Sequence, residues 1–431
     1  MNRLIVLLLF FGVFLVTPKQ GFTQSLPSAL NQLLASHPLI EAAQADVMAA
    51  DYGIDSAKAA WTPQVDLTAY TGRERHDRAY STDFEDTTNK LSVSVTQLVW
   101  DFGATNAQIA VKSIDHQSSL AALEITRQDL ILEGARSYLG LLRAKNLLLY
   151  AHRSTLNVKE QVELERKRMK SGRGSGADLL QAQAQLAGTL AREVRQQGEL
   201  EQANNSYFEL FSEPVDELKM LAEERFPELP ENLDAALQLA ADNSLQLKFS
   251  RHALNQRDKQ VVEARASGFF PSFKLVTGYS ASENPSGTVG SREEYLGTLE
   301  ASYSFDLGLS AKSDLWKARS NRMAQEKRLD NVLKRVSREV KDAWSKYHTS
   351  SQNLVYLTEQ LNRNVAFLEL ARKERELGTR SLLDLLSGET NLLNAESELY
   401  SARVEQQVAI FELLHAVGRL NLSAVMEAKS N

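Results

Sequence analysis

Two long stretches with the hydrophobic spacing of a helix dominate the sequence. Residues 104–170 contain no proline and only two interior glycines, and residues 309–377 contain neither residue type. A helix over residues 104–170 would be roughly 100 Å long, at about 1.5 Å per residue. Because helices of globular proteins average about 11–12 residues, this pattern predicts an extended molecule.

A return helix is expected after each long helix, over residues 178–210 and 382–420. In the second of these, Leu385, Leu392 and Leu399 recur at every seventh position, which is the spacing of a coiled-coil seam. We therefore expect the two helices on either side of each short connection to pack antiparallel.

Four segments alternate between apolar and polar residues, as β-strands do. They are expected at about residues 64–76, 90–100, 272–282 and 293–305. In the second segment, Leu91, Val93 and Val95 share one side, with serine and threonine on the other. This is the weak signature of a transmembrane β-strand, although an ordinary half-buried hairpin gives the same pattern. The polar stretches 72–89 and 282–291 are expected to be exposed loops.

The same order of elements occurs twice, which indicates an internal duplication. A first helix, over residues 37–60 in the first half, should end before a proline, because the residue preceding proline is driven out of the helical region. Three pairs of landmarks then recur at separations that agree within three residues. They are Pro63 and Pro271, the WDFG and FDLG motifs ending at Gly103 and Gly308, and the corner glycines Gly172 and Gly378.

The fold class is therefore mainly α-helical with a small β content. The chain divides into a signal peptide (1–25), a first repeat (26–210), a linker (211–243), a second repeat (244–422) and a C-terminal tail (423–431). The linker contains three prolines and a short predicted helix at about residues 233–242. We expect the linker to form a small mixed region beside the long helices.

The N-terminus has the pattern of an export signal. A short positive segment, Met1–Arg3, precedes the apolar segment Leu4–Val16, which is too short to span a membrane as a helix. The mature chain should start near Leu26, with a start anywhere from Gly21 to Gln24 as the alternative. If the exported protein enters a membrane, it must do so with strands or amphipathic surfaces.

The composition excludes several kinds of binding site and catalytic site. The formal net charge of −6 gives no reason to expect nucleic acid as a partner. The absence of cysteine excludes disulfides, thiolate metal sites, a cysteine nucleophile and a lipid anchor on cysteine. The seven histidines form no metal-binding motif, and the glycine-rich segment 172–176 lacks the Lys-Ser/Thr of a phosphate loop, so it indicates a flexible turn. We expect neither a cofactor, nor a metal, nor an enzyme.

Charged residues mark both corners between the long helices and the return helices. Arg380 and Asp384 are four residues apart, so they share one helix face about one turn apart. Asp178 has the place of Asp384 in the first corner. A solvated ion pair at an ordinary corner is the alternative to a functional role.

Four strands per chain cannot close a barrel, and an open sheet edge is not tolerated in lipid. Two chains would give eight strands, whose interior is filled by side chains, whereas three would give twelve strands around a lumen. A channel therefore favours a homotrimer in outer-membrane lipid. Trp61, Tyr70 and Trp100 lie near the predicted strand ends, where they fit an aromatic girdle at the membrane surface and ordinary packing equally well.

This order of elements resembles the TolC family of outer-membrane efflux and type I secretion channels. The residues that carry the resemblance are Pro63, Pro271, the WDFG and FDLG motifs, and the corner segments 172–180 and 378–386. The resemblance implies a trimeric, passive exit duct in the outer membrane of a Gram-negative bacterium. It would have a 12-stranded barrel in the membrane and a helical tunnel in the periplasm. It further implies a periplasmic adaptor (a membrane fusion protein) and an inner-membrane ABC or RND pump as partners.

The resemblance also implies a closed periplasmic tip at the corners. Arg380 would pair with Asp178 of a neighbouring subunit, and Asp384 would ring the tunnel mouth. This chain departs from the family in two places. Ser387 replaces a second acidic residue, and Arg375 replaces a tyrosine. The competing interpretation is a periplasmic coiled-coil adaptor or scaffold without a channel, and the cargo stays open between protein, drug and metal.

Overall fold

The computed structural model describes residues 25–77, 79, 83–212, 229–304, 307 and 309–422. The expected signal peptide up to residue 24, residues 213–228 of the linker, residues 305, 306 and 308 of the FDLG motif and the C-terminal tail lie outside the described residues, and these expectations stay predictions. In the first half the elements are α1 (Leu26–Ser36), α2 (Pro38–Lys58), η1 (Ala59–Trp61), β1 (Gln64–His76), β2 (Phe84–Trp100), α3 (Ala104–Lys170) and α4 (Gly176–Phe211). In the second half they are α5 (Leu233–Asn243), α6 (Leu245–Phe269), β3 (Ser272–Glu283), η3 (Pro285–Gly287), β4 (Ser291–Ser302), α7 (Ser310–Glu376) and α8 (Leu382–Ala416).

The helical predictions are largely confirmed. The bounds of α3, α5 and α7 differ by no more than one residue from the expected ones, because no proline or left-handed glycine interrupts these stretches. The expected first helix over residues 37–60 was incomplete. A separate helix, α1, precedes it, because His37 is extended (ψ 130°) and Pro38 opens a new helix at its first position. The second return helix ends at Ala416, earlier than residue 420.

The strands form one antiparallel sheet in the order β1-β2-β3-β4. The stretch 72–89, expected to be a loop, is mostly strand. The β1–β2 ladder continues through Gly72 and Thr88 to the pair His76 and Phe84. The ring of Phe84 is buried and packs against His76 at 6.1 Å between centroids. β2 therefore starts six residues earlier than expected, and β4 ends at Ser302 rather than at residue 305.

The strand register gathers apolar side chains on one face of the sheet. Val65 lies opposite Val95, Leu67 opposite Val93, Tyr279 opposite Tyr295, and Leu275 opposite Leu299. Val93 is in turn opposite Tyr279 across the central β2–β3 pair, so these residues share the same face. Many of them are exposed, as at Leu67 and Tyr295. The sheet thus presents a largely apolar face, interrupted by Gln97 and Thr277, that nothing in the described chain covers.

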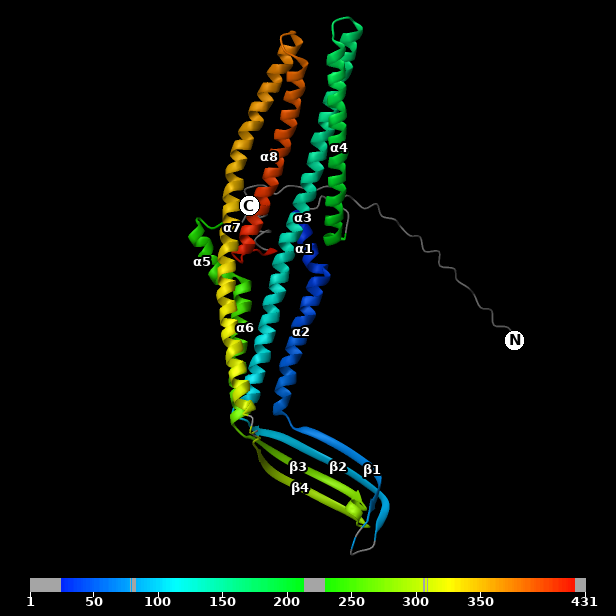
Figure 1. The fold of residues 1–431 in the computed structure, drawn as a ribbon, viewed down its shortest axis with the longest axis vertical. Coiled ribbons are helices and arrows are strands. Elements are labelled where there is room, and N and C mark those ends of the chain that lie inside the picture. Colours follow the sequence, from blue (N-terminus) through cyan, green and yellow to red (C-terminus); the bar gives the residue numbers. More distant parts are fainter. Residues whose placement is uncertain are drawn as a thin grey trace, which may run out of the picture.

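The helices form a long rod above the sheet (Figure 1). In the half nearer the sheet, α2, α3, α6 and α7 pack side by side in that order. In the other half, α3 and α4 form one antiparallel hairpin, and α7 and α8 form a second. None of the helices in the described part of the chain is both long enough and apolar enough to span a membrane.

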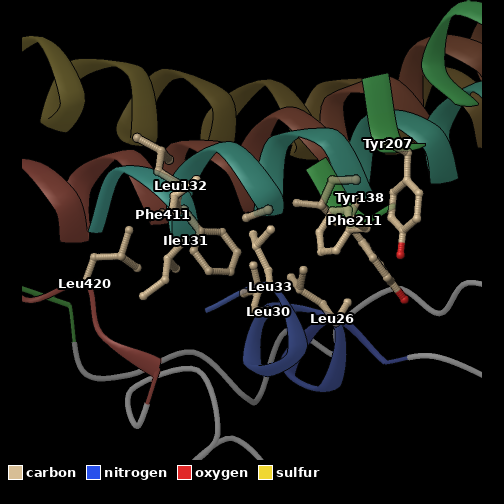
Figure 2. Packing of buried hydrophobic residues seen from close by; sticks show 14 of the residues in the cluster. Leu26, Leu30, Leu33, Ile131, Leu132, Tyr138, Tyr207, Phe211, Phe411 and Leu420 are labelled. Atoms are coloured by element: carbon tan, nitrogen blue, oxygen red, sulfur yellow. The ribbon is translucent and has the colours of Figure 1, made fainter. Parts of the chain in front are cut away.

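The main hydrophobic core lies at mid-height, where α1 packs against α3 beside Tyr207 and Phe211 of α4 (Figure 2). Leu26 and Leu30 of α1 are fully buried, together with Tyr138 of α3. Gly134 makes room for them, because a Cβ at this position would lie 2.8 Å from the methyl groups of Leu30 and Leu33. Burying each such leucine contributes about 1.5–3 kcal/mol, so this core is a main source of stability. A smaller cluster joins α5 to α7 and α8.

Polar contacts connect the two hairpins along the seam between α3 and α8. The carboxylate of Glu412 accepts hydrogen bonds from Arg136 of α3 (2.6 Å) and Lys346 of α7 (2.7 Å). Burial alone would raise the pKa of Glu412, but these two cations lower it below its usual value. Further along, Asn146 donates to the hydroxyl of Tyr400 at 2.8 Å, and burial raises the pKa of Tyr400 to about 12.

Candidate functional site

The candidate site lies at the two corners, at the end of the rod opposite the sheet (Figure 1). Both corners stop a helix in the same way. Gly172 and Gly378 have positive φ angles of 71° and 80°, a conformation that favours glycine. The residue after each glycine donates its N–H to a carbonyl five residues back, Arg173 to Arg168 at 2.9 Å and Thr379 to Glu374 at 3.0 Å.

Each following helix starts with a serine cap. The side chain of Ser175 accepts from the N–H of Ala177 at 3.1 Å, and that of Ser381 accepts from the N–H of Asp384 at 3.2 Å. A serine at the cap satisfies one of the free N–H groups of the first turn. The glycine and the serine are three residues apart in both corners, so the two corners share one local design.

The central charge of the site is Arg375, near the end of α7. Its guanidinium lies 3.0 Å from the carboxylate of Glu165 on α3 and 3.7 Å from that of Asp178 on α4. It also donates to the carbonyl of Arg380 at 3.1 Å. Glu165 is only 2% exposed and accepts a second bond, of 2.9 Å, from Arg168. One side chain therefore connects both hairpins within a single protomer.

Arg380 has its contacts within the second corner. Its guanidinium donates to Glu374 at 2.8 Å, lies 3.5 Å from Asp384 and sits over the ring of Phe367 at 4.9 Å. The hydrogen bond to Glu374 raises the pKa of Arg380 further, so this side chain is cationic at every relevant pH. Arg380 and Asp384 do lie together, but the expectation that they share one helix face is wrong, because Arg380 lies in the corner before the cap Ser381 and only Asp384 is on α8.

Apolar side chains pack next to the charged site, on the side towards the middle of the rod. Val162 of α3, Ala182 of α4 and Leu382 and Leu386 of α8 form a small buried cluster between the corners. This cluster is far smaller than the core at mid-height. The two corners are therefore held together by a few apolar contacts and by the pairs of Arg375.

Sequence reasoning placed Asp178, Arg375, Arg380 and Asp384 in one region, and the structure does bring them together. Within one chain, however, the cation beside Asp178 is Arg375 and not Arg380. The expected pair between Arg380 and Asp178 joins two subunits and stays a prediction, as does any role of Ser387, which is exposed.

Glu165 was missed. It continues the buried stripe of Val158 and Val162 on α3 at the spacing of a helix face. A glutamate on such a stripe is the signal that could have revealed it.

The predicted boundary residues lie at the junction of the sheet and the helices. Trp100 packs edge-on against Phe102, which stacks on Phe270 at 4.7 Å. Gly103 has a φ of 90°, and Asp101 caps α3 by accepting from the N–H groups of Gly103 and Thr105. Pro63 and Pro271 each directly precede a strand, as expected.

Within the described ranges, no group of three or more acidic or histidine side chains is arranged to hold a metal ion. The corner charges are paired with each other, and no hydroxyl–histidine pair lies among them. Their arrangement suits reversible contacts between helices better than acid–base chemistry.

A small antiparallel sheet at one end of two long helical hairpins is the fold of several solved outer-membrane channels. The fold matches the solved outer-membrane channel OprN with a TM-score of 0.79, at 22% sequence identity and over 91% of this chain and 89% of that one.

The chain belongs to the outer membrane efflux protein family, whose model matches residues 29–210 and 236–419. It is 25% identical to outer membrane protein TolC of Vibrio cholerae serotype O1, over 95% of this chain and 94% of the relative. It is 24% identical to the alkaline protease secretion protein AprF of Pseudomonas aeruginosa, over 98% and 89%. This is a family of outer-membrane export proteins and not of enzymes, and its TolC-like channels work in tripartite efflux or secretion systems.

Proposed function

We propose that this protein is the outer-membrane exit duct of a tripartite export system and works as a homotrimer. The observation that carries the proposal is the uncovered apolar face of the sheet, together with the unpaired outer edges of β1 and β4. An apolar face suits contact with lipid, and unpaired edges in lipid require closure into a barrel. Three copies supply twelve strands, enough for a lumen.

The two halves of the chain support an origin by internal duplication. Each has a helix, two strands, a helix of 67 residues and a return helix, in that order. Three copies would therefore continue the barrel as a cylinder of helices in the periplasm. The pump and adaptor of the inner membrane would supply energy and select cargo, because no metal-binding cluster lies in the described part of the duct.

We further propose that the corner site is the resting gate of this duct. The pairs of Arg375 with Glu165 and Asp178 hold the two hairpins of one subunit together. Arg380, with Asp178 of the neighbouring subunit, would connect adjacent subunits. Three copies of Asp384 around the axis would favour cations at the mouth. A partly exposed pair such as Arg380 with Asp178 of the neighbouring subunit would contribute roughly 0–1 kcal/mol, so a docking partner could separate it.

The test is fractionation followed by conductance. We expect the protein in the outer-membrane fraction, as a trimer that needs detergent and conducts ions in a planar bilayer. Asp178→Ala and Arg380→Ala should each raise that conductance. Unchanged conductance in both variants would remove the gate, whereas a monomer in the periplasmic extract would replace the duct with the scaffold. Co-purification of the pump and adaptor would then decide between protein secretion, for which the relative AprF is named, and efflux of small compounds.

A further inference from the structure

A pocket of about 250 Å³ lies where the two helical hairpins meet, between the core at mid-height and the corners. Its walls come from α3, α4 and α8, so both hairpins contribute to it. Sites for drug-sized ligands measure about 300–1,000 Å³, so this pocket suits a small ion or molecule. None of the described carboxylates lines it. Its polar lining residues are Arg192, Arg195, Gln196, Asn394 and Ser397.

Two arginines of α4 give the pocket its positive charge. Arg192 and Arg195 are three residues apart, so their side chains lie on one side of the helix. The guanidinium of Arg192 donates to the side-chain oxygen of Asn394 on α8 at 2.9 Å, which connects the two hairpins beside the pocket. Arg195 is exposed and, among the residues that the structure describes, has no hydrogen-bond or ion-pair partner. Its guanidinium is therefore free to bind a ligand.

The acidic residues next to these positions already have cationic or histidine partners of their own. Glu193 contacts His152 of α3 at 2.7 Å, and this hydrogen bond lowers the pKa of Glu193. Glu396 of α8 pairs with Arg153 of α3. Neither carboxylate comes within ion-pair distance of either arginine of the pocket. The described part of the chain therefore leaves the positive charge of the pocket without a neutralising partner.

Gln196 adds a hydrogen-bond acceptor to the same pocket. Its side-chain carbonyl oxygen is buried and has no hydrogen-bond partner among the described residues. Buried polar atoms are normally paired, because an unmade hydrogen bond costs free energy. A ligand with an O–H group could supply the missing donor after a small rotation of this side chain. The pocket thus offers two guanidinium groups and one acceptor.

We infer that this pocket binds hydrogen phosphate. The planar guanidinium groups of Arg192 and Arg195 match the oxygens of a phosphate group, which arginine often binds through two parallel hydrogen bonds. Hydrogen phosphate keeps one O–H at neutral pH, and that group can donate to the carbonyl oxygen of Gln196. Sulfate has the same tetrahedral shape but no O–H, so it would leave this oxygen unpaired.

A bound phosphate would connect the two hairpins of one chain. Arg192 and Arg195 belong to the first hairpin, whereas Asn394 and Ser397, which can donate from an amide and a hydroxyl, belong to the second. A ligand that binds this packing of the hairpins and no other stabilises it by mass action. The site lies within a single chain, so it does not depend on the proposed trimeric duct.

Titration calorimetry on the detergent-extracted protein tests the site, with inorganic phosphate and sulfate as probes at constant ionic strength. We expect phosphate to bind about tenfold or more tightly than sulfate, because only phosphate pairs with Gln196. Arg195→Gln should weaken phosphate binding about tenfold or more, because hydrogen bonds to a charged group are lost. It should leave the thermal melt in phosphate-free buffer unchanged, since this side chain has no partner to lose.

Two more variants separate the roles. Gln196→Leu should remove most of the preference for phosphate over sulfate, because the acceptor is gone. Arg338→Gln takes away an exposed arginine of α7 outside the pocket, so it is the control and should bind phosphate as the wild type does. Equal phosphate binding by the wild type and Arg195→Gln, or no measurable binding by the wild type, would overturn the site. Equal affinities for phosphate and sulfate would overturn the assignment to hydrogen phosphate.

Hydrogen exchange measures whether the ligand connects the hairpins. Phosphate should slow the exchange of amides around residues 185–197 of α4 and 390–398 of α8 in the wild type, and not in Arg195→Gln. Binding without this slowing would overturn the connection. Each of these failures would leave the exit duct standing, because fractionation and conductance test the duct separately.

Discussion

Removal of the Arg375 side chain would leave the buried carboxylate of Glu165 with one partner instead of two. Glu165 is 2% exposed, and after Arg375→Ala it would keep only the bond from Arg168. The same change removes the bond to the carbonyl of Arg380. We expect both corners to loosen, while the core at mid-height stays folded.

The expected magnitude follows from these contacts. A hydrogen bond to a charged group contributes about 1.5–3 kcal/mol, and Arg168 and entering water would compensate part of that loss. We expect a local cost of about 2 kcal/mol, which corresponds to roughly 30-fold faster exchange of the amides near the ends of α3 and α7. Hydrogen exchange followed by mass spectrometry on the detergent-extracted protein measures this rate for peptides from each region.

Two variants make the experiment decisive. Glu165→Gln together with Arg375→Gln removes both charges, so it should cost about 1–2 kcal/mol less than the two single changes added together. Arg363→Ala is the matched control on α7, because Arg363 is 81% exposed and pairs only with Glu359 of the same helix. Such a surface pair contributes roughly 0–1 kcal/mol. Additive single effects, or equal exchange in the Arg375→Ala and Arg363→Ala variants, would refute the reasoning.

Three further substitutions, the first with a matched control, test the packing and the seam. Gly134→Val should destabilise the protein by about 1–3 kcal/mol in a thermal melt, because its Cβ meets the methyl groups of α1, whereas Gly140→Val on the same helix has open space and should be nearly neutral. Tyr400→Phe should cost about 1 kcal/mol near neutral pH. The stability that the raised pKa of Tyr400 provides is fully present below about pH 10 and is lost as the pH rises towards 12. In thermal melts at increasing alkaline pH, the Tyr400→Phe variant should therefore lose less stability than the wild type. The pKa of Glu412 is lowered in the folded protein, so the stability that this carboxylate contributes is present above about pH 4.5 and is lost as the pH falls through its folded pKa. Glu412→Gln should therefore flatten the acid side of the profile of stability against pH. An unchanged profile would contradict this.

The long helices could be predicted closely because their limits are set by local chemistry. Gly172 and Gly378 stop helices at left-handed positions, and Ser175 and Ser381 start new ones, all of which is visible in the sequence. The start of β2 was missed because the polar segment around Asp86 forms a strand through its ladder with β1. That pairing depends on residues far apart along the chain.

At the corner site, too, contacts between residues far apart along the chain could not be predicted from the sequence. A charged side chain is usually exposed, so the position of Glu165 on a buried stripe was overlooked. The partner of Asp178 within the chain could not be predicted either, since it depends on how two hairpins lie against each other. Short spacing along the chain revealed the pair of Arg380 and Asp384 because that contact is local, even though Arg380 precedes α8 and is not part of it.

The unbroken course of α3 has a mechanical consequence. From Tyr138 in the main core to Lys170 at the first corner, the helix runs for about 50 Å without a proline or a glycine other than Gly140. A stiff lever of that length amplifies small tilts, so that leaning by about 5° at the core would move the corner sideways by roughly 4 Å. In the proposed trimer, widening of the mouth at the corners would therefore require no refolding of either corner, only a slight lean of the helices above the core.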